Sequence, residues 1–554
     1  MKNKNSTIKK NIVLAFQNHK KNNFKVAESI YKKILKLNPN HFDSIFLLGS
    51  LLLQTKNYDK AIQLLNKAIQ IKPDYADAYH NLGLAFLELG EFKKAMDYSK
   101  KAIQTQHSHV EAYNNLGNVF KELREFSKAK NCYLQAIQIQ PNHAKAHNNL
   151  GNIMKELGEF EKAIDSYQKA IQIQPFHANA HYNLGLLFKV LGKFEKTIGS
   201  YQMAIRYEPE NLIIHYELSN LKKEILDTNL KNKVNKIIKE KKSTKQNLAY
   251  GNFLLSKYEL KDKNYEKEFN YLIKGHFHYF ESEKIKFEKE TDYWLNKLPN
   301  IKELVSFKKS NKKNNSKIKP IFIIGVPRCG STLVEKVIAS GSKEIPMGEE
   351  ISILSYFIGK KIGEQQTLNF SDIKDLENKI IEEYKQNKLI QEEHDYVFTD
   401  KSLDNFFYMY LIKEIFPNAK IINCRRNALS SIMSILKTNL RDIPWAHNLE
   451  HIFKFFNIYY QITENFKKKF PNFIYDLDFE EFINNPKIES KKLLKFCNLP
   501  WDKKCLEFYR RNDLVSKTAS NIQIRKAIYK DPLNKNLPYK KFLDKYGKKY
   551  SWFN

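Results

Sequence analysis

The chain has 554 residues, 42% of them hydrophobic, which is enough for two to four domains with packed cores. Its 93 Lys and Arg residues against 61 Asp and Glu give a formal net charge of +32. A charge of this size is compatible with a nucleic-acid or membrane-surface partner. Lys is abundant throughout the chain, however, mostly at expected solvent-facing helix positions, so we expect no nucleic-acid partner.

The five cysteines form neither a CxxC pair nor a His/Cys metal-ligand spacing. This pattern predicts free thiols in a reducing compartment and no metal site. The N-terminal segment MKNKNSTIKKNIVLAFQ is basic but has no long apolar stretch, and no run of 18 apolar residues occurs in the chain. We therefore expect a soluble cytoplasmic protein without a membrane span.

Residues 8–242 carry a repeat of 34 residues. Glycine recurs with this spacing, each time after a leucine, at Gly49, Gly83, Gly117, Gly151 and Gly185. Alanine recurs at two further phases, and proline closes most of the units. This is similar to the tetratricopeptide (TPR) signature, in which small residues allow two helices to cross closely. The resemblance predicts six helix pairs that stack into an α-solenoid, a right-handed superhelix.

An asparagine recurs in the first helix of four units, two residues before the glycine: Asn81, Asn115, Asn149 and Asn183. First helices line the concave face of a TPR solenoid, where an amide can both donate and accept hydrogen bonds. A similar ladder is known in the TPR domain of O-GlcNAc transferases, which implies binding of an extended protein or peptide. The alternative is that this asparagine only belongs to the repeat consensus and faces water.

Three segments follow the repeats. Residues 243–304 have helical, TPR-like spacing without the strict period, so we expect a degenerate unit that caps the solenoid. Residues 305–318 are polar, charged and aperiodic, which predicts a linker. Residues 319–554 are then expected to form a second domain.

The second domain begins with the segment PIFIIGVPRCGST, residues 320–332. The apolar run 321–324 predicts a buried strand, and residues 333–339 a helix after a Gly-rich turn. A turn of this kind before a helix N-terminus holds a phosphate with its amide groups and the helix dipole. The spacing is close to a Walker A loop, but Ser331 stands in place of the lysine and Arg328 lies inside the loop. This argues against an ATP or GTP hydrolase and fits one nucleotide 5′-phosphate with a non-phosphate group attached.

This loop resembles that of sulfotransferases that use 3′-phosphoadenosine 5′-phosphosulfate (PAPS), above all the tyrosylprotein sulfotransferases and the bacterial TPR-linked sulfotransferases. Their loop reads G-x-P-R-[SC]-G-[ST]-T-L; the alternative is an ordinary strand–turn–helix of another α/β domain. The resemblance implies an α/β P-loop-like domain with a mainly parallel sheet, PAPS as co-substrate and no required metal. It implies cofactor contacts from the loop residues Arg328, Cys329, Gly330, Ser331 and Thr332.

The resemblance also implies catalytic residues. A G-E-E segment like that at Glu349 and Glu350 supplies the base that takes the proton of the acceptor hydroxyl. The spacing from Arg328 favours Glu350, whereas bacterial relatives with G-E-L favour Glu349, so both stay open. Lys401, at the end of the predicted strand YVFTDK, matches a lysine that contacts the bridging oxygen of the leaving group. Arg328 would help to neutralise the phosphosulfate.

The segment FPNAKIINCRRNALSSIMS, residues 416–434, matches the family's 3′-phosphate site. Arg426 at the expected strand end and Ser434 eight residues later stand at its spacing. A guanidinium and a hydroxyl can hold the dianionic phosphate that distinguishes PAPS from ATP. Residues 517–529 resemble the loop that covers the cofactor, with Ser520 and Lys526 as candidate contacts.

The resemblance therefore implies transfer of a sulfuryl group from PAPS to an acceptor hydroxyl, with a protein tyrosine as the first candidate and the TPR array as the binder of substrate or partner. The alternatives are a glycan or small-molecule acceptor, or a TPR scaffold whose second domain binds nucleotide without turnover. The tyrosylprotein enzymes are dimers, which leaves a homodimer open.

Overall fold

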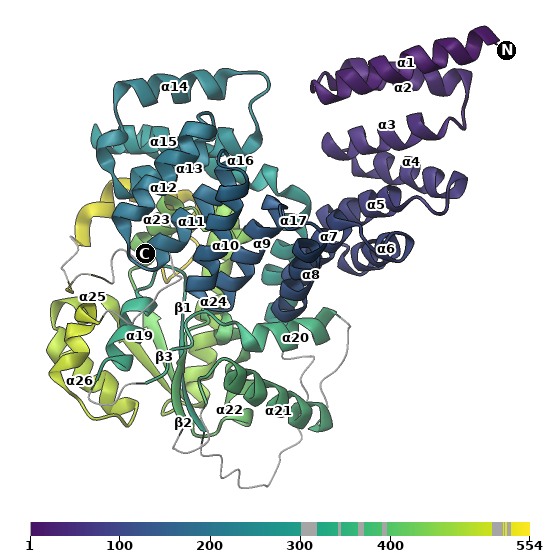
Figure 1. Ribbon diagram of the computed structural model, residues 1–554. Coiled ribbons are helices and arrows are strands. Elements are labelled where there is room, and N and C mark those ends of the chain that lie inside the picture. The colour runs from purple at the N-terminus through teal and green to yellow at the C-terminus, as the bar shows by residue number, and fades with distance from the viewer. Residues whose placement is uncertain are drawn as a thin grey trace. The chain divides into compact units, whose positions relative to one another are not determined.

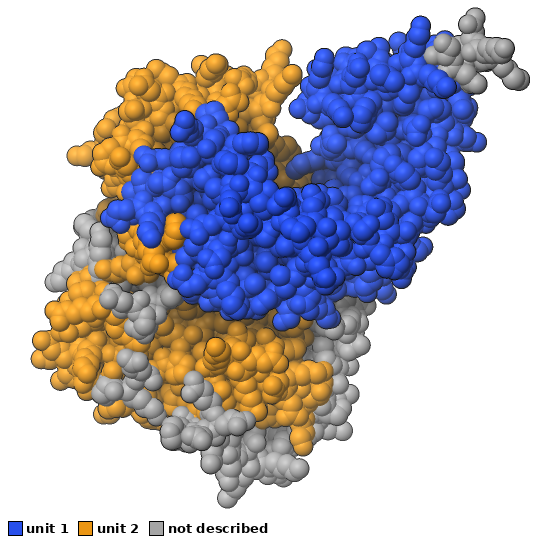
Figure 2. Space-filling model, viewed as in Figure 1, with its two compact units in different colours: residues 1–187, 195–209 blue, residues 188–194, 210–554 orange. Residues whose placement is uncertain are grey.

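The computed structural model describes residues 2–300, 318–341, 345–363, 370–390, 396–511, 525, 527–528 and 533–553 (Figure 1). The chain divides into two compact units, residues 1–187 with 195–209 and residues 188–194 with 210–554 (Figure 2). Most of the predicted linker lies outside the described residues. None of the described helices is both long and apolar enough to cross a membrane.

The first unit consists of consecutive helices that pack in pairs (Figure 1). They are α1 (Lys2–Lys20), α2 (Phe24–Leu37), α3 (Phe42–Gln54), α4 (Tyr58–Ile71), α5 (Ala76–Glu88), α6 (Phe92–Thr105), α7 (Val110–Glu122), α8 (Phe126–Ile139), α9 (Ala144–Glu156), α10 (Phe160–Ile173), α11 (Ala178–Val190) and α12 (Phe194–Tyr207). The predicted α-solenoid of helix pairs is confirmed.

The repeated glycines lie where the two helices of a pair cross. A Cβ atom at Gly151 would lie 2.6 Å from Cε1 of Tyr167, and one at Gly117 would lie 2.6 Å from Cε1 of Tyr133. Both tyrosine rings are fully buried. The repeated glycine therefore marks a close helix crossing, in which it faces an aromatic ring at Gly117, Gly151 and Gly185, a leucine at Gly49 and a serine at Gly83.

The second unit opens with a further helical region: α13 (Leu212–Leu221), α14 (Thr228–Lys239), α15 (Lys245–Lys261), α16 (Tyr265–Ser282), α17 (Lys284–Asp292) and short turns to Asn300. Its apolar residues join one continuous core with those of the sheet that follows. Inside this core His276 Nδ1 lies 2.9 Å from His447 Nδ1, which ties α16 to the 3₁₀ helix Pro444–His447. Residues 243–300 thus share a core with the C-terminal domain, whereas their role as a solenoid cap stays a prediction.

The C-terminal domain is built on a parallel sheet of four described strands in the order β2-β1-β3-β4. The strands are β1 (Ile318–Gly325), β2 (Tyr396–Asp400), β3 (Lys420–Arg425) and β4 (Ile474–Asp478). Residues 320–325 of β1 are buried without alternation, because helices cover both faces of a parallel sheet. The predicted α/β domain with a mainly parallel sheet is confirmed.

The helices of this domain connect the strands and follow them (Figure 1). They are α19 (Ser331–Ala339), α20 (Ile353–Gly363), α21 (Phe370–Gln386), α22 (Met409–Ile415), α23 (Ala428–Thr438), α24 (Leu449–Lys469), α25 (Phe479–Asn484), α26 (Pro486–Phe496) and α27 (Lys540–Gly547). Parallel strands direct their carboxyl ends to one edge of the sheet, where α/β proteins bind their ligands.

We predict that Gly151→Ala destabilises the first unit, because the new methyl group displaces the buried ring of Tyr167. Overpacking of this kind typically costs about 1–3 kcal/mol. Chemical denaturation followed by circular dichroism would measure the loss.

Gly199→Ala is the matched control, because Gly199 lies inside α12 with no atom within 4 Å of an added Cβ. This variant should gain roughly 0.5–1 kcal/mol from the helix propensity of alanine. Equal effects of the two substitutions would contradict the close helix crossing.

Candidate functional site

The carboxyl edge of the sheet gathers segments that are far apart in the sequence. The loop 326–330 follows β1, Lys401 follows β2, Arg426 follows β3, and Phe479 follows β4. Gly325 pairs with Cys424, so β1 and β3 end nearly level, whereas Phe322 pairs with Asp400, so β2 ends three residues before β1. The strand order therefore places the loop between Lys401 and Arg426.

The loop after β1 is compact and tightly packed. Gly330 has φ of 97° and caps α19, and a Cβ there would lie 2.1 Å from the ring of Phe479. Arg328 also adopts a left-handed conformation, with φ of 70°. A left-handed backbone is unfavourable for a residue with a Cβ, so the fold holds the arginine there against its local preference.

The side chain of Arg328 points to the residue predicted for the 3′-phosphate. Its Nε donates a hydrogen bond of 3.0 Å to Ser434 Oγ on α23. Arg426 Nη1 donates to the carbonyl oxygen of Arg328 at 3.0 Å, and its guanidinium lies over the ring of Phe479. The contacts join the first loop to the end of β3 and to α23.

Glu480 positions the turn after β3. Its carboxylate lies 3.8 Å from Arg426 Nε and accepts the backbone N–H of Asn427 at 3.2 Å. Burial raises the pKa of Glu480, while the N–H of Asn427 and the charge of Arg426 oppose that rise. Asn427 in turn caps α23, since its side chain accepts the N–H of Ser430 at 3.0 Å.

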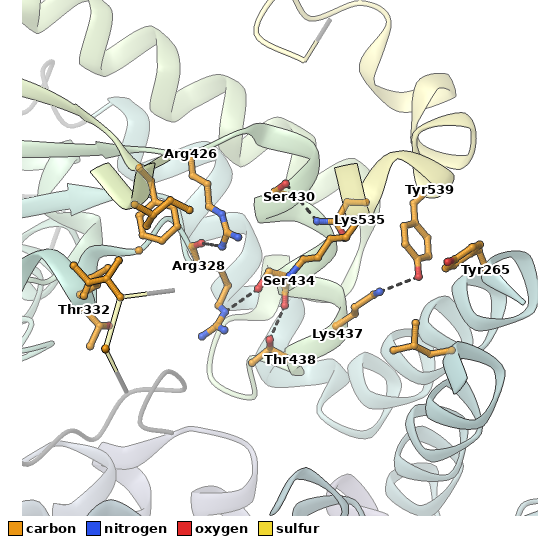
Figure 3. Close-up of a pocket in the computed structure, with 18 residues that line it drawn as sticks. Tyr265, Arg328, Thr332, Arg426, Ser430, Ser434, Lys437, Thr438, Lys535 and Tyr539 are labelled. Carbon is orange, nitrogen blue, oxygen red and sulfur yellow. Dashed lines mark hydrogen bonds between the residues drawn. The ribbon is translucent and has the colours of Figure 1, made fainter. Parts of the chain in front are cut away.

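Arg328, Arg426, Ser434 and the ring of Phe479 line a cavity of about 520 Å³ (Figure 3). The sequence-predicted residues among those that line it are Arg328, Gly330, Thr332, Arg426 and Ser434. Cys329 and Ser331 belong to the same loop but are not among its described lining residues. Cys329 is instead fully buried, and its thiol lies against that of Cys424.

Three lining residues that the sequence analysis missed lie on the same helix as Ser434: Ser430, Lys437 and Thr438. Ser430 lies four residues before Ser434, and Lys437 and Thr438 lie three and four residues after it. Residues with this spacing lie on one face of a helix. This periodicity was a usable signal, and it would have added all three residues to the candidate site.

The remaining wall of the cavity comes from segments that no local pattern connects with the loop. Tyr265 belongs to α16, and Lys535, Asn536 and Tyr539 belong to the 3₁₀ helix Leu533–Tyr539. Lys437 Nζ donates to Tyr539 Oη at 2.9 Å, and both contact the buried carboxylate of Glu268. Burial lowers the pKa of Lys437, and the charge of Glu268 opposes this shift.

Three of the four predicted catalytic residues, Lys401, Glu349 and Glu350, form a second group around the end of β2, whereas the fourth, Arg328, lines the cavity. Lys401 is fully buried, and its Nζ donates to Glu350 Oε1 at 2.7 Å, while the side chain of Glu350 is 51% exposed. Burial by itself lowers the pKa of Lys401, but the charges of Glu350 and Glu335 outweigh burial and raise it above its ordinary value. The lysine is therefore held in its charged form at the buried side of a half-exposed carboxylate.

The side chain of Glu349 contacts a different lysine from that of Glu350. Its side chain contacts Lys336 at 3.5 Å, and its carbonyl oxygen accepts the N–H of Lys401 at 2.9 Å. Glu349 has φ of 49°, a left-handed conformation in the turn that precedes α20. Of the two glutamates, Glu350 is the one that is paired with Lys401 and reaches the surface.

Ser520 and Lys526, the candidates in the predicted covering loop, lie outside the described residues. Ala527 and Ile528, just beyond them, line the cavity. The described part of this segment therefore reaches the cavity. The roles of Ser520 and Lys526 stay predictions.

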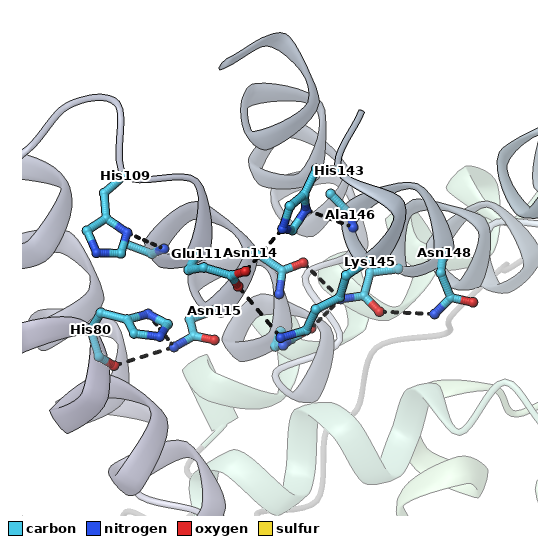
Figure 4. Close-up of polar contacts among 12 residues, drawn as sticks. His80, His109, Glu111, Asn114, Asn115, His143, Lys145, Ala146 and Asn148 are labelled. Atoms are coloured by element: carbon cyan, nitrogen blue, oxygen red, sulfur yellow. Dashed lines mark hydrogen bonds and ion pairs between the residues drawn. The ribbon is translucent and has the colours of Figure 1, made fainter. Parts of the chain in front are cut away.

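The asparagine ladder of the first unit donates its amides across neighbouring repeats (Figure 4). Asn115 Nδ2 lies 3.0 Å from His80 Nδ1. The other three donate as follows: Asn81 to Ser50 Oγ at 2.8 Å, Asn149 to Asn114 Oδ1 at 2.9 Å, and Asn183 to Asn148 Oδ1 at 2.9 Å. The amide donors thus join successive first helices, and peptide binding by this ladder stays a prediction.

A histidine–carboxylate contact also links successive repeats (Figure 4). His143 Nδ1 accepts the N–H of Ala146, so Nε2 carries the proton that it donates to Glu111 Oε1 at 3.1 Å. This hydrogen bond lowers the pKa of Glu111 to about 2. His109 makes the equivalent contact with Asp77 at 3.0 Å.

Comparison with known proteins identifies both parts of the chain. Residues 320–503 match the model of the Sulfotransferase family. Models of TPR repeats match residues 30–63, 49–90, 76–106, 110–143, 132–165 and 151–192. The chain therefore carries TPR repeats followed by a domain that matches the Sulfotransferase family, as the sequence predicted. The matches do not single out the tyrosylprotein enzymes.

One curated relative is an uncharacterized protein of Aquifex aeolicus (strain VF5), 30% identical over 318 residues, or 54% of this chain and 41% of the relative. The chain thus spans about two fifths of that relative's length. Similar solved structures include a thermophilic TPR protein of Thermus thermophilus (20% identity, 32% of this chain, 98% of that one, TM-score 0.31). PilF of Pseudomonas aeruginosa matches at 17% identity over 40% of this chain and 99% of its own, with a TM-score of 0.34. The TPR assignment rests on the family models and the helix pairs.

Because the backbone of Arg328 is left-handed, two substitutions can distinguish its backbone strain from the contacts of its guanidinium. Arg328→Gly and Arg328→Ala both lose the guanidinium, so both should weaken nucleotide binding equally. Only glycine adopts this conformation without a steric penalty, so Arg328→Gly should be more stable than Arg328→Ala by about 1 kcal/mol. Thermal or urea unfolding of the ligand-free variants would measure the difference, and equal stability would contradict a strained loop.

Proposed function

We propose that this protein transfers a sulfuryl group from PAPS to an acceptor hydroxyl. The observation that carries the proposal is the convergence of Arg328, Arg426 and Ser434 in one cavity at the carboxyl edge of a parallel sheet. Two guanidinium groups and a hydroxyl beside a helix N-terminus suit a ligand with more than one phosphate-type anion. The match to the sulfotransferase family supports the same interpretation.

In this proposal the loop and the N-terminus of α19 bind the 5′-phosphosulfate, together with Arg328. Arg426 and Ser434 bind the 3′-phosphate, which ATP does not have. Arg426 also donates to the carbonyl oxygen of Arg328, so one residue serves the 3′-phosphate and fixes the 5′-phosphosulfate loop. Loss of Arg426 should therefore impair both subsites.

The chemical step is an in-line substitution at sulfur. The acceptor oxygen forms a bond to sulfur as the bond from sulfur to the 5′-phosphate oxygen breaks, and the electron pair of that bond leaves with 3′-phosphoadenosine 5′-phosphate. Glu350 takes the acceptor proton, because its carboxylate is half exposed and paired with Lys401. Lys401 stabilises the negative charge that develops on the departing phosphate.

The ion pair between Lys401 and Glu350 couples these two roles. While the ammonium of Lys401 donates to Glu350 Oε1, that oxygen is engaged by the lysine and not by the acceptor hydroxyl. A lysine that turns toward the leaving oxygen would release Glu350 for the acceptor. The base would then become available when the donor nucleotide is in place.

We propose a polypeptide, with tyrosine as the accepting residue, as the acceptor. TPR repeats provide extended surfaces for protein or peptide partners, and a phenol is a hydroxyl that a carboxylate can deprotonate during transfer. The first unit would bind the substrate polypeptide or a partner that presents it.

The first test is calorimetric titration with 3′-phosphoadenosine 5′-phosphate, ATP and 5′-AMP. We expect the 3′-phosphate to be required for tight binding. Arg426→Ala should weaken that binding by roughly 1.5–3 kcal/mol, about ten- to a hundredfold or more, because it removes a charge-assisted hydrogen bond. Arg510→Ala is the matched control, since Arg510 is an exposed arginine that pairs locally with Glu507. Equal or tighter binding of ATP would overturn the proposal.

Glu350→Gln should bind 3′-phosphoadenosine 5′-phosphate like the wild type and lose turnover by about a hundredfold or more, since general-base catalysis contributes on the order of 10²–10⁴. Release of this nucleotide from PAPS, with a pool of tyrosine-containing acidic peptides as acceptor, would measure it. Loss of turnover in Glu349→Gln, with Glu350→Gln active, would transfer the role of base to Glu349.

A further inference from the structure

A buried carboxylate, Glu335, lies between the two groups of the candidate site. It sits on α19, in the second turn of the helix that begins at the phosphate loop, and is fully buried. It is not among the described residues that line the cavity, and it is separate from the three predicted catalytic side chains at the end of β2. The sequence analysis gave it no role.

Glu335 connects the elements that carry those side chains. Its Oε1 accepts the hydroxyl of Thr399 on β2 at 2.8 Å and the backbone N–H of Glu349 at 3.0 Å. Thr399 lies two residues before Lys401, and Glu349 directly precedes Glu350. One carboxylate oxygen therefore fixes both the strand end that presents the lysine and the turn that presents the base.

The second oxygen of Glu335, Oε2, is buried and has no hydrogen-bond partner among the described residues. Leaving a buried acceptor without a hydrogen bond is unfavourable, and more so for a charged one. Its negative charge is balanced by nearby cations instead, because the charges of Lys401 and Lys336 both act on it. Burial raises the pKa of Glu335, and the charge of Lys401 opposes that rise.

We propose that Glu335 is a positioning residue of the sulfuryl transfer, which holds the Glu349–Glu350 turn against the end of β2 and remains as the counter-charge of Lys401 when Glu350 turns to the acceptor. This inference rests on the proposed function. Lys401 is fully buried, and a buried charge is unfavourable unless an opposite charge lies near it. When Glu350 turns to the acceptor, Glu335 is the fully buried carboxylate that still acts on the lysine.

The groups that act on the charge of Lys401 are the carboxylates Glu350, Glu335 and Glu349, the ammonium of Lys336, and the buried thiols Cys329 and Cys424. Glu350 and Glu335 raise the pKa of Lys401 more than Glu349 does. While Glu350 holds the acceptor proton, Glu335 and Glu349 are the carboxylates that still raise the pKa of Lys401. Of these two, Glu335 has the larger effect.

The test compares Glu335→Gln with wild type in the full-length chain, by release of 3′-phosphoadenosine 5′-phosphate from PAPS and by calorimetric titration of that nucleotide. The amide keeps the shape of the side chain and removes its charge. We expect nucleotide affinity within about twofold of wild type and kcat lowered at least about tenfold, a modest part of what general acid–base groups contribute. We also expect the alkaline limb of the kcat–pH profile to move to lower pH, since Lys401 loses a carboxylate that raises its pKa.

Thr399→Val separates geometry from charge, and it serves as the second variant if Glu335→Gln does not fold. It removes one hydrogen bond to Glu335 and leaves the charge, so kcat should fall while the alkaline limb stays in place. Glu414→Gln, a glutamate on the exposed side of α22, is the matched control and should behave like wild type.

A wild-type chain that binds 3′-phosphoadenosine 5′-phosphate but never releases it from PAPS would overturn the proposed function. Turnover by the wild type, with Glu335→Gln retaining wild-type kcat and pH profile, would overturn only the role of Glu335. A joint loss of nucleotide binding and thermal stability in both Glu335→Gln and Thr399→Val would also overturn it, because the residue would then be structural.

Discussion

The parallel pairing of β1 with its two neighbours is the constraint on which the candidate site depends. Gly325 pairs with Cys424, so the loop after β1 begins level with the segment that carries Arg426. Phe322 pairs with Asp400, so Lys401 follows β2 beside the last residues of β1. A shift of either register by one residue would turn the flanking side chains to the other face of the sheet. The cluster of cationic groups at this edge is therefore a consequence of backbone pairing.

Within this frame the loop breaks the local preferences of its residues. Arg328 is left-handed, and Gly330 leaves no room for a Cβ against Phe479. The surrounding contacts compensate, since Arg426 holds the carbonyl of Arg328 and Ser434 holds its guanidinium. Strain that is maintained by surrounding contacts is common at functional sites, and here it aims one guanidinium into the cavity.

Buried charged side chains occur both beside the cavity, at Glu268, and in the group around Lys401. Lys401 and Glu335 are fully buried, Lys336 is nearly so, and Glu349 and Glu350 lie on their outer side. Replacing such a network by apolar side chains is often neutral or stabilising for a fold, so stability alone does not explain it. An ammonium that stays charged next to a half-exposed carboxylate fits the transfer of an anionic group that we propose.

The sequence by itself determined the elements that a local period or a short motif can specify. The 34-residue repeat indicated the helix pairs, and the segment after Pro320 indicated strand, loop and helix. A spacing of eight residues, matched to a family motif, joined Arg426 to Ser434. Only the tertiary structure decided which distant residues contact these motifs. Tyr539 and Glu268 meet although 271 residues separate them, and Glu335 reaches Thr399 across 64. Such contacts arise from packing between elements, which hydrophobic periodicity along one element does not encode.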